Sequence, residues 1–371
     1  MEQNTDWIQK ISMHDYVKVN DDVFFFALNF NGLYRMHLPE RTLTLLACVP
    51  GESLYQKHIY GAITQNAEKL YMPPMNGNEI ALFDLKENVF EKISLKYDAK
   101  GLPFKFAGAV SNGAKVFLIP ARYRYMIAID AGTQELEYID SWIAEMNIPD
   151  TYGGLFVRHG YMIKGEYLYM ASMADNILVK MSTCTMKAEL IRVGEIRDGF
   201  VDMCFDEDGE NIWFAYEHRP IILKWHEKKG SYITYDSMPM GFEYGEFPFI
   251  NVIDTGSKVT AIGYQANMSV EIRKADNSVQ QAKWDIAGTE GSFNTWKARH
   301  YFARKVTNSS FLVNNIDDNS FDIIECGKKK ESFTIIDECS GVTLAYRNGQ
   351  ILRESKDIGL QQFLDFIGKR T

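Results

Sequence analysis

The stretch from Glu68 to Leu95, EKLYMPPMNGNEIALFDLKENVFEKISL, contains three short apolar runs separated by two turns. Each run has the length and the residue types of a β-strand, and the letters between them are typical of turns. The next part of the chain, Ala114–Asp140 (AKVFLIPARYRYMIAIDAGTQELEYID), has almost the same pattern. Such self-similarity indicates a repeat architecture, in which each unit buries its apolar faces against its neighbours.

The repeat extends along the chain at spacings of 40 to 54 residues. A small, apolar segment opens each unit, two apolar strands follow, and a more polar strand ends it. These openers begin near Ile59, Phe106, Gly160, Phe200, Pro248 and Ala298. Four strands per unit of this length are the signature of a β-propeller blade. The polarity of the four strands agrees with this fold, because the innermost strand of a blade is crowded around the central channel and the outermost strand is in contact with water.

The first 50 residues supply one more blade (YVKVND, VFFFALNF, GLYRMHLP, RTLTLLACV), which predicts seven blades in one all-β domain over residues 1–371. Six blades with flanking structure is the alternative. The predicted blades cover residues 13–50, 59–95, 106–140, 160–194, 200–237, 248–285 and 298–337.

The tail of the chain carries two further predicted elements. Residues 341–354 (GVTLAYRNGQILRE) have strand character and are expected to close the propeller by pairing with an edge of the first blade. Residues 357–369 place Ile358, Phe363 and Ile367 at helical spacing, which predicts a short C-terminal helix. Ordinary packing is the expected role of this helix.

The blade letters LYxxPM…EIxxYDLxxxxFExI resemble those of uncharacterised bacterial β-propellers over nearly the whole chain. This resemblance implies a fold and no activity. The single Trp284–Asp285 dipeptide lacks an upstream Gly-His, and no kelch double glycine recurs from blade to blade, so the motifs do not indicate a WD40 or kelch propeller. DEDGENIWFAYE, Asp206–Glu217, resembles a segment of streptogramin-lyase-like and sensor-kinase propellers, here in one blade only.

Composition limits the classes of partner. The net charge of −9 argues against nonspecific nucleic-acid binding, and no apolar run approaches the length of a membrane span. The N-terminus lacks the basic start and apolar core of a signal peptide, so the cytoplasm is the expected location. Five cysteines without CxxC spacing indicate neither a zinc site nor a disulfide framework. We therefore expect no metal and no cofactor.

Functional residues are expected at one edge of the blades. In up-and-down connectivity, the loops entering the innermost strands and the turns between strands two and three lie on the same side. Basic residues outnumber acidic ones there, and arginine suits bidentate capture of a carboxylate or phosphate. The predicted ligand-binding residues are Lys105, Arg122, Arg124, Arg158, Arg219 and Arg299, with Tyr123 and Tyr125 as stacking partners.

The pattern predicts a propeller that binds an anionic or carbohydrate-like ligand, or a protein partner, at this edge. Two structural alternatives remain open: solvated loop charges, and arginines paired with acids of neighbouring blades. Three long connections, residues 141–160, 237–249 and 286–300, are expected to form a rim or lid on the same side.

An enzyme acting on a carbohydrate or cyclic substrate is the alternative function. His58, His159 and His300 lie at innermost-strand entries and are candidates for a general base. A hydrolase needs two facing carboxylates, for which Asp198 and Glu246 are the acidic entry residues. A lyase needs a histidine or tyrosine base near an arginine, which fits the basic entries better. The chain has no GxSxG, HExxH or P-loop motif.

Overall fold

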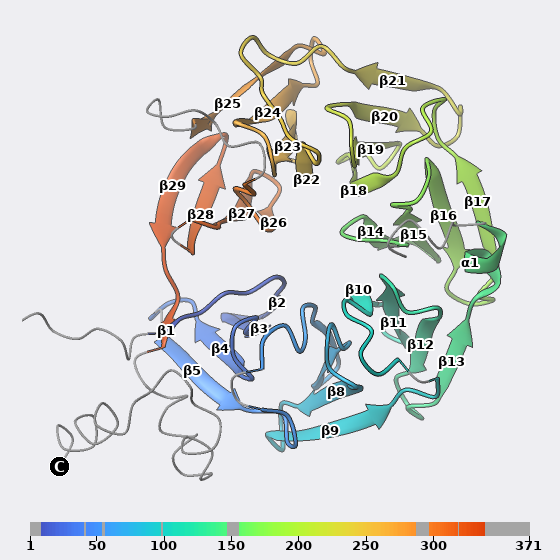
Figure 1. The fold of residues 1–371 in the computed structure, drawn as a ribbon, viewed down its shortest axis with the longest axis vertical. Helices are drawn as coiled ribbons and strands as arrows, with labels where there is room; N and C mark the ends of the chain where they lie inside the picture. Colours follow the sequence, from blue (N-terminus) through green and yellow to red (C-terminus); the bar gives the residue numbers. More distant parts are fainter. Residues whose placement is uncertain are drawn as a thin grey trace, which may run out of the picture. The chain divides into compact units, whose positions relative to one another are not determined.

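A computed structural model of the chain describes residues 9–337, except residues 41, 54–55, 98, 147–155, 287–296 and 318. The fold is a seven-bladed β-propeller of four-stranded antiparallel sheets, with the strands of each blade in sequence order (Figure 1). The predicted fold class and the predicted number of blades are confirmed.

The first two blades precede residue 97. Blade one consists of β2 (Val17–Val19), β3 (Asp22–Phe26), β4 (Leu33–His37) and β5 (Thr42–Ala47). Blade two consists of β6 (Thr64–Asn66), β7 (Lys69–Met72), β8 (Glu79–Asp84) and β9 (Val89–Ser94).

Five blades follow. Blade three consists of β10 (Phe106–Ser111), β11 (Lys115–Pro120), β12 (Met126–Asp130) and β13 (Leu136–Ile139). Blade four consists of β14 (Tyr161–Lys164), β15 (Tyr167–Ala171), β16 (Ile177–Ser182) and β17 (Ala188–Arg192). Blade five consists of β18 (Phe200–Phe205), β19 (Asn211–Tyr216), β20 (Ile222–His226) and β21 (Tyr232–Tyr235). Blade six consists of β22 (Phe249–Asp254), β23 (Lys258–Gly263), β24 (Met268–Arg273) and β25 (Val279–Ile286). Blade seven consists of β26 (Ala303–Thr307), β27 (Ser310–Asn315), β28 (Ser320–Glu325) and β29 (Lys328–Phe333).

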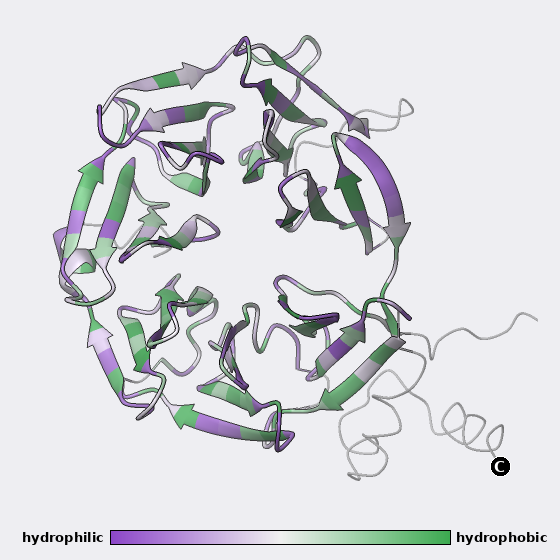
Figure 2. Cartoon of the chain, turned by 180° about the vertical axis from the view of Figure 1, so that it is seen from behind, coloured by the Kyte–Doolittle hydropathy of each residue, from purple (hydrophilic) through white to green (hydrophobic). Residues whose placement is uncertain are grey.

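Burial follows the position of a strand within its blade. In β11, every residue after Lys115 is buried, as are the first four residues of β12. The outermost strand β29 carries Lys328, Lys329 and Lys330, all exposed, and is strongly hydrophilic in Figure 2. Strands packed on both faces read as continuous apolar runs, whereas an outer strand with one wet face does not.

The first strand of blade two begins later than the sequence predicts. The opener was placed at Ile59, but β6 starts at Thr64. Tyr60 forms only an isolated bridge with Pro74. Proline has no N–H to donate to a strand ladder, which limits regular pairing in this segment.

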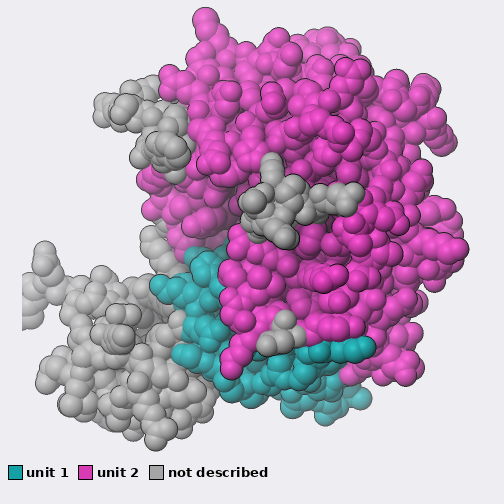
Figure 3. Space-filling view, turned by 45° about the vertical axis from the view of Figure 1, so that its right-hand side comes forward, with its two compact units in different colours: residues 1–63, 68–96, 335–371 teal, residues 64–67, 97–334 magenta. Residues whose placement is uncertain are grey.

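The chain divides into two compact units, coloured in Figure 3. Unit 1 comprises residues 1–63, 68–96 and 335–371, and unit 2 comprises residues 64–67 and 97–334. In unit 1, β1 (Gln9–Lys10) pairs antiparallel with β30 (Ile336–Asp337). The predicted closing strand, residues 341–354, and the predicted helix, residues 357–369, lie outside the described residues. A single domain over the whole chain stays a prediction.

Blades three to seven, all in unit 2, follow one another along an arc, with their first strands on its inner side (Figure 1). Backbone hydrogen bonds join each entry loop to nearby strand-two-to-three turns: Tyr123 N donates to Lys105 O (3.0 Å) and Glu217 N to Gly199 O (2.8 Å). We call the edge formed by these entry loops and turns in residues 97–334 the entry edge.

Among the residues that the structure describes, one helix interrupts the strands, and the sequence did not predict it. The connection after β13 begins with α1 (Ser141–Glu145), which buries Trp142 and Ile143. Among the described residues, no helix has the length and apolarity needed to cross a membrane.

Candidate functional site

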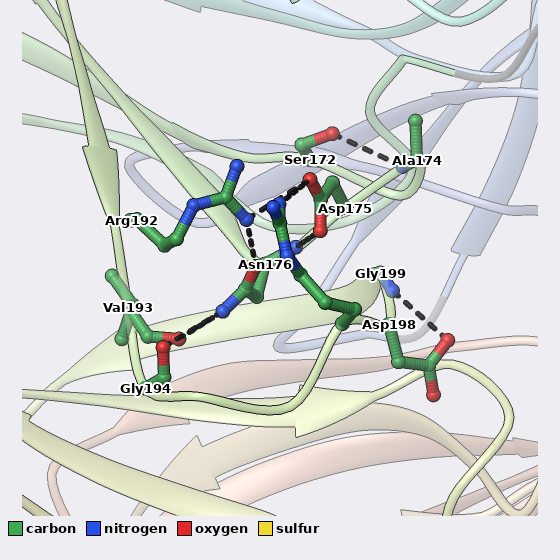
Figure 4. Close-up of polar contacts among 10 residues, drawn as sticks. Ser172, Ala174, Asp175, Asn176, Arg192, Val193, Gly194, Asp198 and Gly199 are labelled. Atoms are coloured by element: carbon green, nitrogen blue, oxygen red, sulfur yellow. Dashed lines mark hydrogen bonds and ion pairs between the residues drawn. The ribbon is translucent and has the colours of Figure 1, made fainter. Parts of the chain in front are cut away.

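Two guanidinium groups share one carboxylate at the entry edge of blade four (Figure 4). Asp175 lies in the turn between β15 and β16, and its Oδ2 accepts from Nη1 of Arg192 at 3.0 Å and from Nη1 of Arg197 at 2.7 Å. The arginine side chains are 43% and 64% exposed. Both arginine side chains are therefore partly accessible from solvent.

Asn176 holds this arginine pair in place. Its side-chain amide donates to the carbonyl oxygens of Val193 (3.0 Å) and Gly194 (2.9 Å), in the connection between Arg192 and Arg197. Its own amide oxygen accepts from Arg192. Because Asn176 is fully buried, these bonds fix the turn to the connection that precedes blade five.

Asp198 is the centre of a second polar cluster, one residue after Arg197. Its buried carboxylate accepts from Gly199 N (2.9 Å), from His218 N (3.2 Å) and from His218 Nδ1 (2.9 Å). Arg219 Nε lies 3.8 Å from its Oδ2. A carboxylate only accepts hydrogen bonds, so the Nδ1 of His218 is the donor in this bond.

Glu217 is a buried carboxyl group next to this pair. Its side chain is 7% exposed, and its Oε2 lies 3.7 Å from His218 Nδ1 without a hydrogen bond. Burial raises the pKa of Glu217 to about 7, against weaker opposing effects of His218 and Arg158. The negative charges of Asp198 and Glu246 raise this pKa further. The group therefore changes protonation state near neutral pH.

Gly199 makes the approach of blades four and five possible. A Cβ atom at this position would lie 1.7 Å from the carbonyl oxygen of Met173, in the turn of blade four. Phe200 N, one residue later, donates to Ser172 O at 2.7 Å. Only glycine fits here, and the contact brings the Asp175 cluster and the Asp198 cluster side by side.

Aromatic rings border both sides of the cluster. The ring of Phe247, in the loop entering blade six, lies 5.1 Å from the ring of His218. The guanidinium of Arg158 lies over the ring of Tyr264, 5.4 Å from its centroid. We call the set Asp175, Arg192, Arg197, Asp198, Glu217, His218 and Arg219 the blade-five site.

The predicted residues at the junction of blades six and seven form a buried network instead. Arg299 binds both carboxylate oxygens of Asp285 and donates to Ala266 O at 3.1 Å. His300 Nδ1 donates to Asn314 O (2.7 Å), and its Nε2 lies 3.5 Å from Asp285 Oδ1. The guanidinium of Arg299 is thus engaged in an ion pair between adjacent blades.

Blade three places its predicted residues in three different environments. Lys105 is buried, and its Nζ donates to Leu102 O at 2.7 Å. Tyr123 is also buried and donates to Tyr97 O (3.2 Å), and burial raises its pKa to about 12. Tyr125 stacks on Tyr97 with ring centroids 4.3 Å apart.

The two remaining predicted arginines of blade three differ in exposure. Arg124 is exposed, whereas Arg122 is half-buried, with an Nε that has no hydrogen-bond partner. Whether any of the eight predicted residues binds a ligand stays a prediction. Of this set, only Arg219 belongs to the blade-five site, and Arg158 borders it.

The three candidate histidines have different environments, and a catalytic role for any of them stays a prediction. His159 and His300 are buried in unit 2 at different blades, whereas His58 is an exposed residue of unit 1 with a positive φ of 57°. Within the part of the chain that the structure describes, no group of three or more histidine, cysteine, aspartate or glutamate side chains is arranged to hold a metal ion.

Five of the seven residues of the blade-five site, Asp175, Arg192, Arg197, Glu217 and His218, were not predicted as ligand-binding or catalytic residues. Glu217 and His218 lie in one strand-two-to-three turn, where the letters EHR gather an acid, a histidine and an arginine. Arg192 and Arg197 frame the short connection into blade five. The feature of the sequence that could have indicated this site is the high density of ionisable residues in consecutive connections of neighbouring blades.

No family model and no curated protein matches the chain. Solved structures with similar folds include a catalytically inactive histidine-to-alanine variant of virginiamycin B lyase from Staphylococcus aureus with quinupristin. It is 10% identical, with a TM-score of 0.59, and the match covers 87% of this chain and 97% of that one.

Two further structures have comparable similarity. A streptogramin B lyase has 12% identity and a TM-score of 0.55, covering 89% of this chain and 97% of that one. The β-propeller domain of Cps50 (Swd1) from Myceliophteria thermophila has 9% identity and a TM-score of 0.58, covering 85% and 98%. At these identities the likeness concerns the fold alone.

Proposed function

We propose that this β-propeller binds a small, singly charged carboxylate of carbohydrate-like character at the blade-five site. The observation that carries the proposal is the sharing of Asp175 by Arg192 and Arg197, because two exposed guanidiniums then have one carboxylate between them. A bound carboxylate supplies the second acceptor, in the bidentate geometry for which guanidinium is suited.

The charge balance of the site favours a monoanion. Its three arginines face the two carboxylates of Asp175 and Asp198 in the ion pairs of the described residues. While Glu217 is protonated, this leaves an excess of one positive charge. A phosphate dianion would bring a second negative charge next to Asp198 and Glu217, whereas a carboxylate would not.

Isothermal titration calorimetry with D-galacturonate tests the proposal, with D-glucose and inorganic phosphate as comparison ligands. We expect galacturonate to bind, glucose to bind weakly or not at all, and phosphate to bind more weakly than galacturonate. The double variant Arg192→Met and Arg197→Met removes two charged donors, so its affinity should fall by about tenfold or more.

Arg273→Met is the matched control. Arg273 is also a half-exposed arginine in an ion pair, 3.5 Å from Asp276, but it ends β24 at the opposite edge of its blade. Its replacement should leave galacturonate binding unchanged. Absence of galacturonate binding to the native chain, or equal affinity of the Arg192/Arg197 double variant, would overturn the proposal.

A further inference from the structure

We infer that Glu217 sets the charge that the blade-five site accepts: binding of the carboxylate is coupled to protonation of the Glu217 side chain, so the site loses affinity as the solution becomes basic. The inference rests on the proposed carboxylate site and concerns the regulation of that site. It requires no contact between the ligand and Glu217, because a charge acts on another charge through space.

The backbone places Glu217 next to the arginines of the site. Its N–H donates to Gly199 O at 2.8 Å, and Gly199 directly follows Arg197 and Asp198 in the chain. Arg219, whose Nε approaches Asp198, lies two residues after Glu217 in the same turn. Glu217 therefore belongs to the same two hydrogen-bonded loops as Arg197 and Arg219.

The surroundings of the Glu217 side chain oppose a negative charge. The side chain is 7% exposed, and its Oε2 accepts no hydrogen bond. A carboxyl group that is buried without donors for both oxygens is costly to ionise. Burial accordingly raises the pKa of Glu217 to about 7, so its charge changes within the range in which proteins work.

The charged and titratable groups that face Glu217 come from its own turn and from three entry loops. They are His218 in the turn, Arg158 before blade four, Asp198 before blade five and Glu246 before blade six. Burial has the largest effect and opposes ionisation, as do the two acids, whereas His218 and Arg158 favour it. Because burial dominates, Glu217 is protonated in mild acid and ionised in basic solution.

The charge of the site changes with this protonation. Its three arginines face the carboxylates of Asp175 and Asp198 in the ion pairs of the described residues, which leaves one positive charge in excess while Glu217 is protonated. Ionisation of Glu217 cancels this excess. A bound carboxylate therefore favours protonated Glu217, and by linkage protonated Glu217 favours the bound carboxylate to the same extent.

The pH dependence of binding follows from this sign. A bound anion raises the pKa of Glu217 above its value in the free protein, so affinity is highest below about 7 and falls as pH rises through both values. Calorimetry at pH 6 and pH 9 measures the fall with D-galacturonate, which stays a monoanion at both. We expect binding to the native chain to be about fivefold or more weaker at pH 9. Glu217→Gln should retain most of its affinity there.

Proton uptake during binding identifies the titrating group. Calorimetry at pH 7.5 in Tris and in PIPES, two buffers with different enthalpies of ionisation, gives the number of protons taken up for each galacturonate bound. We expect net uptake by the native chain and none by Glu217→Gln. A histidine can also take up a proton near neutral pH. If His218 were the source, His218→Gln would abolish the uptake and Glu217→Gln would retain it.

Two further variants and a second anion test the role of charge. Glu246→Gln removes an exposed acid that opposes ionisation of Glu217, so the fall in affinity should begin at lower pH. Glu189→Gln, an exposed acid of β17 outside the site, is the matched control and should leave the pH profile unchanged. At pH 9, inorganic phosphate should bind Glu217→Gln more tightly than the native chain, because one negative charge is absent from the site.

The outcomes separate this inference from the proposed function. Galacturonate binding with the same affinity at pH 6 and pH 9, or proton uptake that persists in Glu217→Gln, overturns the coupling and leaves the binding site standing. Absence of galacturonate binding at both pH values overturns both proposals. Should Glu217→Gln fail to fold, an unchanged pH profile in Glu246→Gln overturns the coupling instead.

Discussion

Two of the places at the entry edge where an arginine adjoins a histidine, Arg299–His300 and His218–Arg219, have opposite environments. Arg299 and His300 are 19% and 5% exposed and surround the buried Asp285. His218 and Arg219 are 33% and 56% exposed, and they meet Asp198 from the solvent side. The same residue types thus build an internal ion-pair network in one place and an accessible polar site in the other.

The difference lies in the partners that the neighbouring blades supply. At Arg299 both terminal nitrogens of the guanidinium donate hydrogen bonds, to the two oxygens of Asp285 and to the carbonyl of Ala266. At Arg219 only Nε approaches Asp198, at 3.8 Å. An arginine whose terminal nitrogens bind a buried carboxylate stabilises the fold, whereas a more exposed arginine remains available to a ligand.

The largest expected effect comes from breaking the buried network. Arg299→Met leaves the Asp285 carboxylate buried without its main partner, so stability should fall by about 3–5 kcal/mol. Urea unfolding at pH 7 measures this change. Burial opposes ionisation of Asp285, but the hydrogen bond and charge of His300, followed by the charge of Arg299, hold its pKa well below the ordinary range. The stability that this carboxylate contributes is therefore present above its unfolded pKa and lost in strong acid.

The double variant Arg299→Met with Asp285→Leu removes both charges together. It should lose less stability than Arg299→Met alone, because no uncompensated buried charge remains. An equal or larger loss in the double variant would show that packing, and not charge pairing, is what Arg299 provides.

The next effect concerns Glu217 and has a defined pH dependence. Its pKa of about 7 in the folded state lies above the ordinary value of 4.5, so its contribution to stability is full below about 4.5 and declines as pH rises through 7. Glutamine does not ionise. Glu217→Gln should therefore match the native chain at pH 4 and exceed it by up to about 3 kcal/mol at pH 9, in urea unfolding.

The groups that face Glu217 are His218, Arg158, Asp198 and Glu246. His218 and Arg158 favour its ionised form and the two acids oppose it, so burial decides the direction. A stability difference that is the same at pH 4 and pH 9 would contradict this account.

The smallest effect is expected at the exposed arginines. Arg197→Met removes an ion pair with a side chain that is 64% exposed, so unfolding stability should change by less than about 1 kcal/mol. Thermal unfolding of this variant beside Arg299→Met tests the comparison directly. If Arg197→Met lost as much unfolding stability as Arg299→Met, both arginines would contribute to the stability of the fold and the contrast between them would be wrong.

The blades were predictable because their signal is local. A strand such as β8 can be recognised from its own apolar run. Four such runs per repeat predict a blade even when the neighbouring blades are not known. Helix α1 escaped prediction, since its five residues give too short a pattern to recognise. The late start of β6 was not predicted, because the pairing of Tyr60 with Pro74 as an isolated bridge is visible only in the folded chain.

The site was only partly predictable because its chemistry depends on contacts between blades. Arg158, Asp198 and Arg219 could be placed at the correct edge from connectivity. That Arg158 lies over Tyr264, more than one blade away in sequence, could not be read from either residue. Nor does the sequence reveal that Gly199 admits the carbonyl of Met173 and so joins two clusters.

By itself, the sequence determined that this chain folds as a β-propeller of seven blades. Periodic burial within each blade is sufficient for that result. Only the tertiary structure decided that Arg299 is engaged with Asp285 while Arg192 and Arg197 share one carboxylate. The physical reason is that the availability of a charge depends on how many partners reach it, and those partners come from distant parts of the chain.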